Sequence, residues 1–474
     1  MLAAISRTGG QVASALSGEG DLMVAKRTQR RFRRLVVAFG LVGVSAATGV
    51  IAPEAGAASA TKIVELSKSC PASSAEVEQA VDPKTGDIFS DWIGCDRRGI
   101  GFVLSTDGGS KYSRPMILPA SAGKFTWDPA VTVARDGTVY ASFMIQDGNY
   151  EYPIVDVSID HGRSFVREAR LRPAKQGNWG DRDFIAAGRD GTVYVTWDYG
   201  PSAAAVKFIC PPGGSCSFTN GDLNIVVQKS TNWGRTWGAM VHVSPGYPAG
   251  GADEGPIIVE PDGHIDLVYQ ALSVTNRKTY KLGPGHEYFT SSTDDGAHWQ
   301  APVVLGQSAG TESLQEWWID GALGMDAAGN LYATWDTQGA HDVGWLVYST
   351  DHGRRWSKPV RVTPDVDSAV HIVQVAGASA GIADVGWLAD SSPHGYALYL
   401  RPYSITKGWL GGVVRASGSL YGRSGTWPGD TFGISYLGQN ASASSQHVSV
   451  SWGSSASSSP DRDDIYARPL SLTA

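Results

Sequence analysis

The chain has 474 residues, of which 58 are glycine, and only 18% of its residues are charged. This composition is typical of many short strands joined by tight turns, and no long stretch has the periodicity of an amphipathic helix. The formal net charge of −7 gives no reason to expect nucleic acid or an anionic membrane as a partner.

Residues 1–60 have the features of an export segment. A basic region ends in Arg30-Arg31-Phe32-Arg33-Arg34, an apolar stretch runs from Leu35 to about Ala52, and small-residue cleavage sites follow at Ala55-Gly56-Ala57 or Ala58-Ser59-Ala60. The paired arginines also permit a twin-arginine signal, and the alternative to cleavage is an uncleaved membrane anchor. We expect a signal peptide at 1–60 and a secreted, extracellular monomer, free of the membrane after cleavage. Residues 61–474 then form a single domain with 32 basic and 43 acidic residues.

An eight-residue pattern, Ser-x-Asp-x-Gly-x-x-aromatic, occurs five times, and we call each copy a box. The boxes are Ser105–Tyr112, Ser158–Phe165, Ser230–Trp237, Ser292–Trp299 and Ser349–Trp356. Each follows a short apolar run, which indicates a strand, a tight turn and a second strand. The Ser and Asp oxygens can accept hydrogen bonds from turn amides, and Gly tolerates a positive φ. Asn232 replaces Asp in the third box but keeps an acceptor oxygen.

A second motif precedes each box: a turn containing Gly, followed by an alternating strand such as Asp190-Gly191-Thr192-Val193-Tyr194-Val195-Thr196-Trp197. One repeat therefore contains a first strand, a Gly turn, a second strand, a loop, a third strand, a box and a fourth strand. Successive boxes begin 53, 72, 62 and 57 residues apart. Four antiparallel strands per repeat at such spacings predict an all-β fold, a β-propeller.

Two degenerate repeats, at 370–416 and 430–470, follow the five boxed ones at 74–362. The last repeat ends without a fourth strand. Lys62–Ser67 resembles the fourth strands of other repeats, so we expect it to complete the last blade and close the ring. The predicted number of blades is seven, with six as the alternative.

The boxes resemble the Asp-box (BNR) repeats of the sialidase family, and they span most of the chain after residue 60. The resemblance implies a sialidase-like glycoside hydrolase in which the boxes themselves are structural. It also supports the six-blade alternative, because sialidases have six blades. The chain departs from the family in having no Arg-Ile-Pro-like motif before the first box. The similar string Ser113-Arg114-Pro115 follows that box instead, so the resemblance implies a carbohydrate-active propeller more than specificity for sialic acid.

The four cysteines suit an oxidising compartment. Cys210 and Cys216 bracket a five-residue loop and are predicted to form one disulfide, which leaves Cys70 to pair with Cys95. No zinc-site spacing is present, and we expect neither a metal nor a cofactor.

The chemistry is expected at one end of the ring. If the boxes lie on one face, the Gly turns share it, and the first strands begin on the opposite face, around an opening that we call the mouth. Nine residues before the turn glycines stand Val77, Asp128, Arg182, Glu254 and Asp320. Two carboxylates with different pKa values could act as acid and base on a glycosidic bond, so Asp128, Glu254 and Asp320 are the predicted catalytic residues. The alternative is that these side chains only cap the first strands or bind amides of a neighbouring blade.

Further residues at the starts of the first strands are predicted to bind substrate, because indole rings stack on sugars and polar groups orient them. They are Trp127, Trp179, Asp181, Arg182, Asp183, Asp253, Trp317, Trp318 and Trp427. By contrast, Trp197, Trp335 and Trp452 are assigned to packing between blades. The box histidines His161 and His352 are predicted to be exposed turn residues.

Three functions remain open. The first is a secreted glycoside hydrolase acting on an extracellular glycan. The second is a non-catalytic propeller that binds glycan or protein. The third is a polysaccharide lyase, for which His286, Tyr288 and Arg182 could supply the base and the cation.

Overall fold

The structure is a computed structural model. It describes residues 61–473 apart from 174–177, 201–207, 210–216, 219–222, 245–251, 254, 272–273, 277–280, 283–284, 310–320, 338–342, 364–369, 391–395, 418–428, 439–444 and 457–458. Within this part of the chain, no helix is long and apolar enough to cross a membrane.

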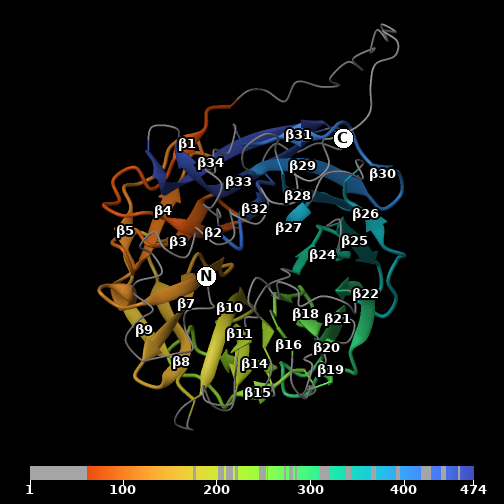
Figure 1. Cartoon of the computed structure of the whole chain (residues 1–474), viewed down its shortest axis with the longest axis horizontal. Helices are drawn as coiled ribbons and strands as arrows, with labels where there is room; N and C mark the ends of the chain where they lie inside the picture. Colours follow the sequence, from red (N-terminus) through yellow and green to blue (C-terminus); the bar gives the residue numbers. More distant parts are fainter. Residues whose placement is uncertain are drawn as a thin grey trace, which may run out of the picture.

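Seven antiparallel sheets stand around a central axis and form a seven-bladed β-propeller (Figure 1). The prediction of seven blades is confirmed, and the six-blade alternative is wrong. In each sheet the first strand lies nearest the axis and the later strands lie progressively farther out (Figure 1). The first strands of neighbouring blades therefore line the centre of the ring.

The strands of blades 1 to 3 follow the predicted order. Blade 1 consists of β2 (Ala75–Val81), β3 (Ile88–Ile93), β4 (Ile100–Ser105) and β5 (Met116–Ile117), and blade 2 of β6 (Thr126–Val133), β7 (Val139–Asp147), β8 (Tyr150–Ser158) and β9 (Arg167–Arg170). Blade 3 consists of β10 (Trp179–Ala187), β11 (Val193–Gly200), β14 (Asn224–Ser230) and β15 (Val241–His242). A 3-10 turn, η3 (Pro119–Ser121), leads from blade 1 to blade 2.

Blades 4 to 6 continue the same order. Blade 4 consists of β16 (Ala252–Asp253), β17 (Ile257–Val259), β18 (Ile265–Ala271), β21 (Gly285–Ser292) and β22 (Val303–Ala309). Blade 5 consists of β23 (Ala322–Met325), β24 (Leu331–Thr337), β25 (Val343–Ser349) and β26 (Val360–Arg361). Blade 6 consists of β27 (Val370–Gly377), β28 (Ile382–Asp390), β29 (Tyr396–Ser404), β30 (Gly408–Trp409) and β31 (Val414–Arg415).

Two short hairpins lie outside the blades. The first joins β12 (Phe208–Ile209) to β13 (Ser217–Phe218), between the second and third strands of blade 3. The second joins β19 (Val274–Asn276) to β20 (Lys281–Leu282) at the corresponding place in blade 4.

The box turns are held by the hydrogen bonds that their sequence predicts. In the fifth box, Gly353 N donates to Ser349 Oγ at 2.9 Å, and Arg355 N donates to Asp351 Oδ1 at 2.9 Å. The third box keeps the same bond with its substituted residue, because Thr236 N donates to Asn232 Oδ1 at 2.9 Å. Serine and Asp or Asn at these two positions are therefore explained by satisfaction of turn amides.

The boxes also join neighbouring blades. Gly353 has a φ of +73°, and a Cβ atom at this position would lie 2.1 Å from the ring of Phe289 in blade 4. The box aromatic Trp356 packs edge-on against the same ring, with centroids 5.0 Å apart. In the structure it contacts the preceding blade, so each such box contributes to an interface between blades.

Tryptophans at the ends of the second strands fill the cores between blades. Trp197, Trp335 and Trp452 are 0%, 1% and 2% exposed, and their assignment to packing is confirmed. Burying an aromatic side chain of this size contributes roughly 2–3 kcal/mol to stability.

The ring is closed by the N-terminal strand, as predicted. Blade 7 consists of β32 (Gly433–Tyr436), β33 (Ser445–Ala456), β34 (Ser459–Thr473) and β1 (Val64–Glu65), and β1 pairs antiparallel with β34. Beyond the strand, Leu66 N donates to Ile465 O at 2.7 Å, and Ile465 N donates to the buried Ser67 Oγ at 2.9 Å. The closing strand thus pairs with the edge of β34, which would otherwise remain unpaired.

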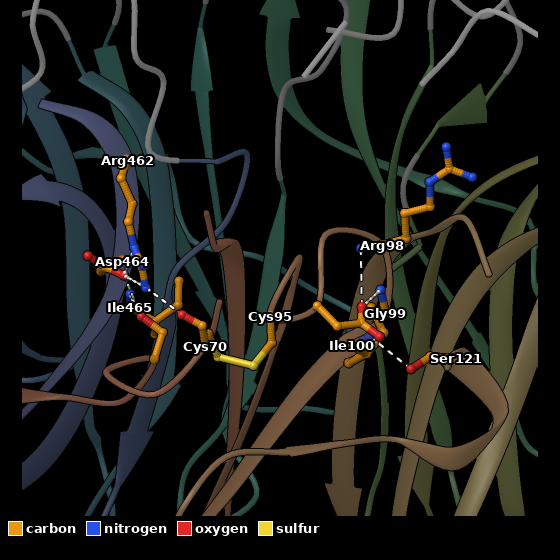
Figure 2. The surroundings of a disulfide bond; sticks show 11 residues. Cys70, Cys95, Arg98, Gly99, Ile100, Ser121, Arg462, Asp464 and Ile465 are labelled. Carbon is orange, nitrogen blue, oxygen red and sulfur yellow. Dashed lines mark hydrogen bonds and ion pairs between the residues drawn. A yellow bond between two sulfur atoms is a disulfide. The ribbon is translucent and has the colours of Figure 1, made fainter. Parts of the chain in front are cut away.

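A disulfide between Cys70 and Cys95 follows the closing strand (Figure 2), as the sequence analysis predicted. Cys70 comes just after β1 in blade 7, and Cys95 follows β3 in blade 1. Arg462 donates from Nη2 to Cys70 O at 2.8 Å and forms an ion pair with Asp464, so this junction is also held by polar contacts. The bond therefore links the first blade covalently to the last. Cys210 and Cys216 lie outside the described residues, and their pairing stays a prediction.

We expect that replacing Cys70 and Cys95 together by alanine lowers the free energy of unfolding by about 3 kcal/mol, because the bond closes a loop of 25 residues in the unfolded chain. Chemical denaturation measures the change. The matched control is Cys210→Ala with Cys216→Ala, which opens only a short local loop and leaves the ring folded. If both variants lose the same free energy of unfolding, the disulfide between Cys70 and Cys95 has no special role in stabilising the ring.

Candidate functional site

Several first strands carry a one-residue bulge near the mouth. The pairing register shifts between Ala75 and Val77 in β2, between Trp127 and Ala130 in β6, and between Asp181 and Phe184 in β10. A bulge re-aims side chains and is common beside functional sites. These bulges place charged side chains in blades 1, 2 and 3.

Three charged residues at the bulges have a left-handed backbone: Glu76, Asp128 and Arg182, with φ of +52°, +45° and +44°. This conformation costs a non-glycine residue about 1–3 kcal/mol, and such strain gathers at functional sites. In blade 1 the sequence analysis selected Val77, which is fully buried in the core. That selection is wrong. The Gly turn of blade 1 (82–87) is one residue longer than the turn of blade 2 (134–138), so counting back nine residues from Gly86 stops one residue short of the equivalent position. Glu76 occupies the equivalent place.

Asp128 and Arg182 join blades 2 and 3 at the mouth. Arg182 N donates to Asp128 Oδ2 at 3.0 Å, and the guanidinium Nη1 lies 3.6 Å from Asp128 Oδ1. Their side chains are 10% and 11% exposed, so the ion pair is largely shielded from solvent. Arg182 Nη2 also reaches Asp430 O at 3.5 Å, at the start of blade 7. One guanidinium therefore bridges three blades around the axis.

Trp127 and Asp181 form a second contact between the same two blades. The indole Nε1 donates to Asp181 Oδ1 at 2.6 Å, and Asp181 stands directly opposite Asp198 in the pairing of β10 with β11. Trp127 is half-buried, whereas Trp179 is only 4% exposed. Of these two indoles, Trp127 is the better placed to meet a ligand.

Two buried carboxyl groups lie close to the ion pair. Burial raises the pKa of Asp183 well above its usual value, and the charge of Asp128 adds to this effect against the opposing influence of Ser142 and Arg182. Burial also raises the pKa of Asp91, in β3, with further contributions from Glu78 and Asp183. The mouth therefore combines carboxyl groups whose pKa is raised by burial with a carboxylate that is paired with an arginine.

The remaining predicted site residues are placed less fully. Asp253 belongs to β16, where it pairs with Gln270, and only its backbone is described. The others lie outside the described residues: Glu254, Trp317, Trp318, Asp320 and Trp427. Their roles stay predictions.

Glu287 is a buried acid that the sequence analysis did not select. It is fully buried in β21, and neither carboxylate oxygen accepts a hydrogen bond from a donor in the described part of the chain. Burial raises its pKa well above the usual value. Its pairing partner Gln270 is also buried, and a Cβ on Gly321 would lie 2.4 Å from Glu287 Oε1. A lone acidic residue beginning a strand is a weak signal in sequence, which is why it was not chosen.

Two of the three residues considered for lyase chemistry, His286 and Tyr288, lie in the same strand. His286 and Tyr288 have ring centroids 6.1 Å apart, and Tyr288 stacks on Tyr269 at 5.4 Å. They belong to the third strand of blade 4, whereas Arg182 lies in the first strand of blade 3. His286 and Tyr288 are thus brought together, whereas Arg182 contacts Asp128, Phe184 and Asp430, in blades 2, 3 and 7.

Buried acids predict a pH-dependent stability. Burial raises the pKa of Glu151, Asp156 and Asp384 to about 7 in the folded protein, whereas the unfolded values are about 4. At a pH between these two pKa values, the folded state binds more protons than the unfolded state. The stability that these three protonated acids contribute to the folded state is therefore complete below about pH 4 and is lost as the pH rises through about 7.

We expect the thermal midpoint to be lower at pH 8 than at pH 5. Groups with lowered pKa values, such as Asp160 and Asp294 at about 2, titrate below this window. Replacing Asp384 by Asn should reduce the difference between the two midpoints, which scanning calorimetry measures. A midpoint that rises from pH 5 to pH 8 would show that these acids are ionised in the fold.

Solved structures share the architecture of the chain. An ulvan lyase from a new family of polysaccharide lyases, bound to GlcA(1-4)Rha3S, superposes with a TM-score of 0.51 at 13% identity, covering 85% of this chain and 95% of its own. A mutant NanB sialidase from Streptococcus pneumoniae gives 0.48 at 11% identity, covering 81% and 83%. An α-L-arabinanase from Penicillium chrysogenum with arabinobiose gives 0.46 at 13% identity, covering 87% and 98%.

No protein-family model matches the sequence, and no curated protein is significantly similar to it. At such low identity, the likeness to the ulvan lyase supports the propeller fold and nothing finer.

Proposed function

We propose that the protein is a secreted, carbohydrate-active propeller, a glycoside hydrolase related to the Asp-box repeat proteins, which acts on an extracellular glycan at the mouth. The observation that carries this proposal is the shielded Asp128–Arg182 pair on two strained bulges with the buried Asp183 beside it. An export segment at 1–60 and a single domain at 61–474 complete the proposal. The solved propellers named above include enzymes that act on carbohydrates.

The proposed roles follow from the two environments. Glycoside hydrolysis needs one carboxylic acid to protonate the leaving oxygen and one carboxylate to act as base or nucleophile. Burial and the nearby charge of Asp128 raise the pKa of Asp183 well above its usual value, which suits the acid. Asp128, held by Arg182, suits the carboxylate. Glu254 and Asp320, from blades 4 and 5, are the other acids that the repeat register places at the mouth, and Trp127 provides a ring for a sugar.

The test uses the purified domain, residues 61–474. A glycan array first identifies bound glycans, and each is then incubated with the protein and assayed for released reducing sugar. A hydrolase gives reducing ends without absorbance from an unsaturated uronate. Binding without any release from any bound glycan would contradict catalysis and favour the non-catalytic propeller.

Lyase chemistry is the second candidate, because His286 and Tyr288 lie side by side at the start of β21. A lyase removes a proton next to a uronate carboxyl group, and a histidine or tyrosine can act as the base. The same assay separates the two reactions, since eliminative cleavage creates an absorbing double bond. Loss of that absorbance in His286→Ala, with Asp128→Asn still active, would favour the lyase over the hydrolase.

A further inference from the structure

A group of metal-ligating side chains lies on the box face, at the junction of blades 4 and 5. Glu260, Asp262 and His264 belong to the Gly turn of blade 4, and His352 belongs to the box of blade 5. Each offers a donor atom, and these four atoms lie within 4.8 Å of one another. Among the described residues this is the one group of three or more His, Cys, Asp or Glu side chains so arranged. It stands on the face opposite the mouth.

The four side chains are already oriented toward one another. His352 Nδ1 lies 2.7 Å from Glu260 Oε2, and His264 Nδ1 lies 2.8 Å from Asp262 Oδ2. The two imidazole rings are 5.2 Å apart. In each pair, a nitrogen and an oxygen that could ligate the same ion already lie next to each other. The turn itself is held by Glu260 N donating to His264 O at 2.8 Å.

The two buried acids at this junction, Glu260 and Asp266, interact with each other and are only partly supplied with donors. Glu260 is 2% exposed and Asp266, behind it in β18, is fully buried. Neither Glu260 Oε1 nor either oxygen of Asp266 accepts a hydrogen bond from a donor in the described part of the chain. Burying charge without compensation is costly. A cation at this place would compensate the two carboxylates.

The other blades provide an internal comparison. Blade 2 has Ala134 where blade 4 has Glu260, and Tyr140 where blade 4 has Asp266, each counted from its turn glycine. Both of these blade 2 residues are buried in an apolar cluster. The fold therefore needs no acid at either position. Blade 5 has an acid at the first position (Asp326) and blade 6 has one at the second (Asp384), whereas blade 4 has acids at both, at the same place where the next box supplies a histidine.

We propose that Glu260, Asp262, His264 and His352 bind a divalent transition-metal ion, and that zinc is the ion that fits this donor set. Two imidazoles and two carboxylates match the tetrahedral coordination that zinc prefers, whereas calcium takes six to eight oxygen ligands. Zinc bonds of about 2.0–2.2 Å set the donors roughly 3.3–3.6 Å apart. Only small rotations of the partly exposed His and Asp side chains are needed to reach this spacing. The ion would fasten blade 4 to blade 5.

The test is zinc binding by the untagged domain, residues 61–474, after treatment with EDTA. Calorimetric titration with zinc chloride should show one site per chain, and zinc should raise the thermal midpoint. His264→Ala and His352→Ala should each lower the zinc affinity more than 10-fold, because loss of a mere supporting residue already costs about 10–100-fold. Circular dichroism establishes that both variants fold.

The matched control is His298→Ala. His298 lies in the box of blade 4 and also contacts an acid, with Nδ1 2.6 Å from Asp294 Oδ2, but its side chain is 89% exposed. We expect the His298→Ala variant to bind zinc with wild-type affinity. As a control for the ion, calcium chloride should not shift the thermal midpoint of the wild-type domain. Absence of saturable zinc binding by the wild type, or unchanged affinity in both His264→Ala and His352→Ala, would overturn the proposal.

Discussion

Replacing Asp128 by Asn should lower kcat/KM on the identified glycan by about 10²–10⁴-fold, the usual contribution of a group that transfers a proton in the transition state. The amide keeps the shape of the side chain and can still accept the hydrogen bond from Arg182 N, so the bulge should survive. What it removes is the ionisable group. If Asp183 is the acid, Asp183→Asn should lower kcat/KM by a similar factor. The plot of kcat/KM against pH for this variant should also lose one of its two limbs.

A matched control separates catalysis from folding. Asp384 is also a fully buried acid with a raised pKa, and it lies in blade 6 near the Gly turn, away from the mouth. Asp384→Asn should therefore keep wild-type turnover. The amide variants of Glu254 and Asp320 complete the series. If every mouth variant folds and retains wild-type turnover on a glycan that the protein cleaves, the acids there are structural and the mechanism is wrong.

The second large effect concerns ring closure. Deleting Thr61–Ser67 removes β1, buried Leu66 and the Ser67 hydroxyl that accepts from Ile465 N. Loss of one large buried side chain costs about 2–5 kcal/mol, and the open edge of β34 adds to it. We expect the thermal midpoint to fall by about 5–10 °C.

A pair of proline substitutions tests the same contact without shortening the chain. Leu66→Pro removes the amide that donates to Ile465 O, so it should destabilise the ring strongly. Lys68→Pro is the control, because Lys68 follows Ser67 in the turn closed by Cys70 N and Ser67 O, a position that proline favours. Equal midpoints for Leu66→Pro and Lys68→Pro would show that the strand contributes little to closure.

The repeats made the fold predictable from sequence. A box fixes a turn through contacts within eight residues, so Ser349, Asp351 and Gly353 could be interpreted without knowing the rest of the chain. The closing strand was predictable because the last repeat lacked a fourth strand. The partner of the box aromatic was not, since Trp356 and Phe289 meet only when two blades pack together.

The site was less predictable for a physical reason. Counting back from a turn glycine located Asp128 and Arg182 but failed in blade 1, where one extra turn residue moved the register from Glu76 to Val77. Counting also gives no information on which acids become buried. The raised pKa values of Asp91 and Glu287 come from burial by distant segments, and the junction of Glu260 with His352 joins residues 92 positions apart.

The pairing of Val64 with Ala467 has a consequence for biosynthesis. β1 is translated before its partner β34, so it must wait while the six intervening blades are made. Because loop closure over such a separation is slow, we expect circularisation to be a late event in maturation. Until then the blades form an open arc whose two ends are not joined.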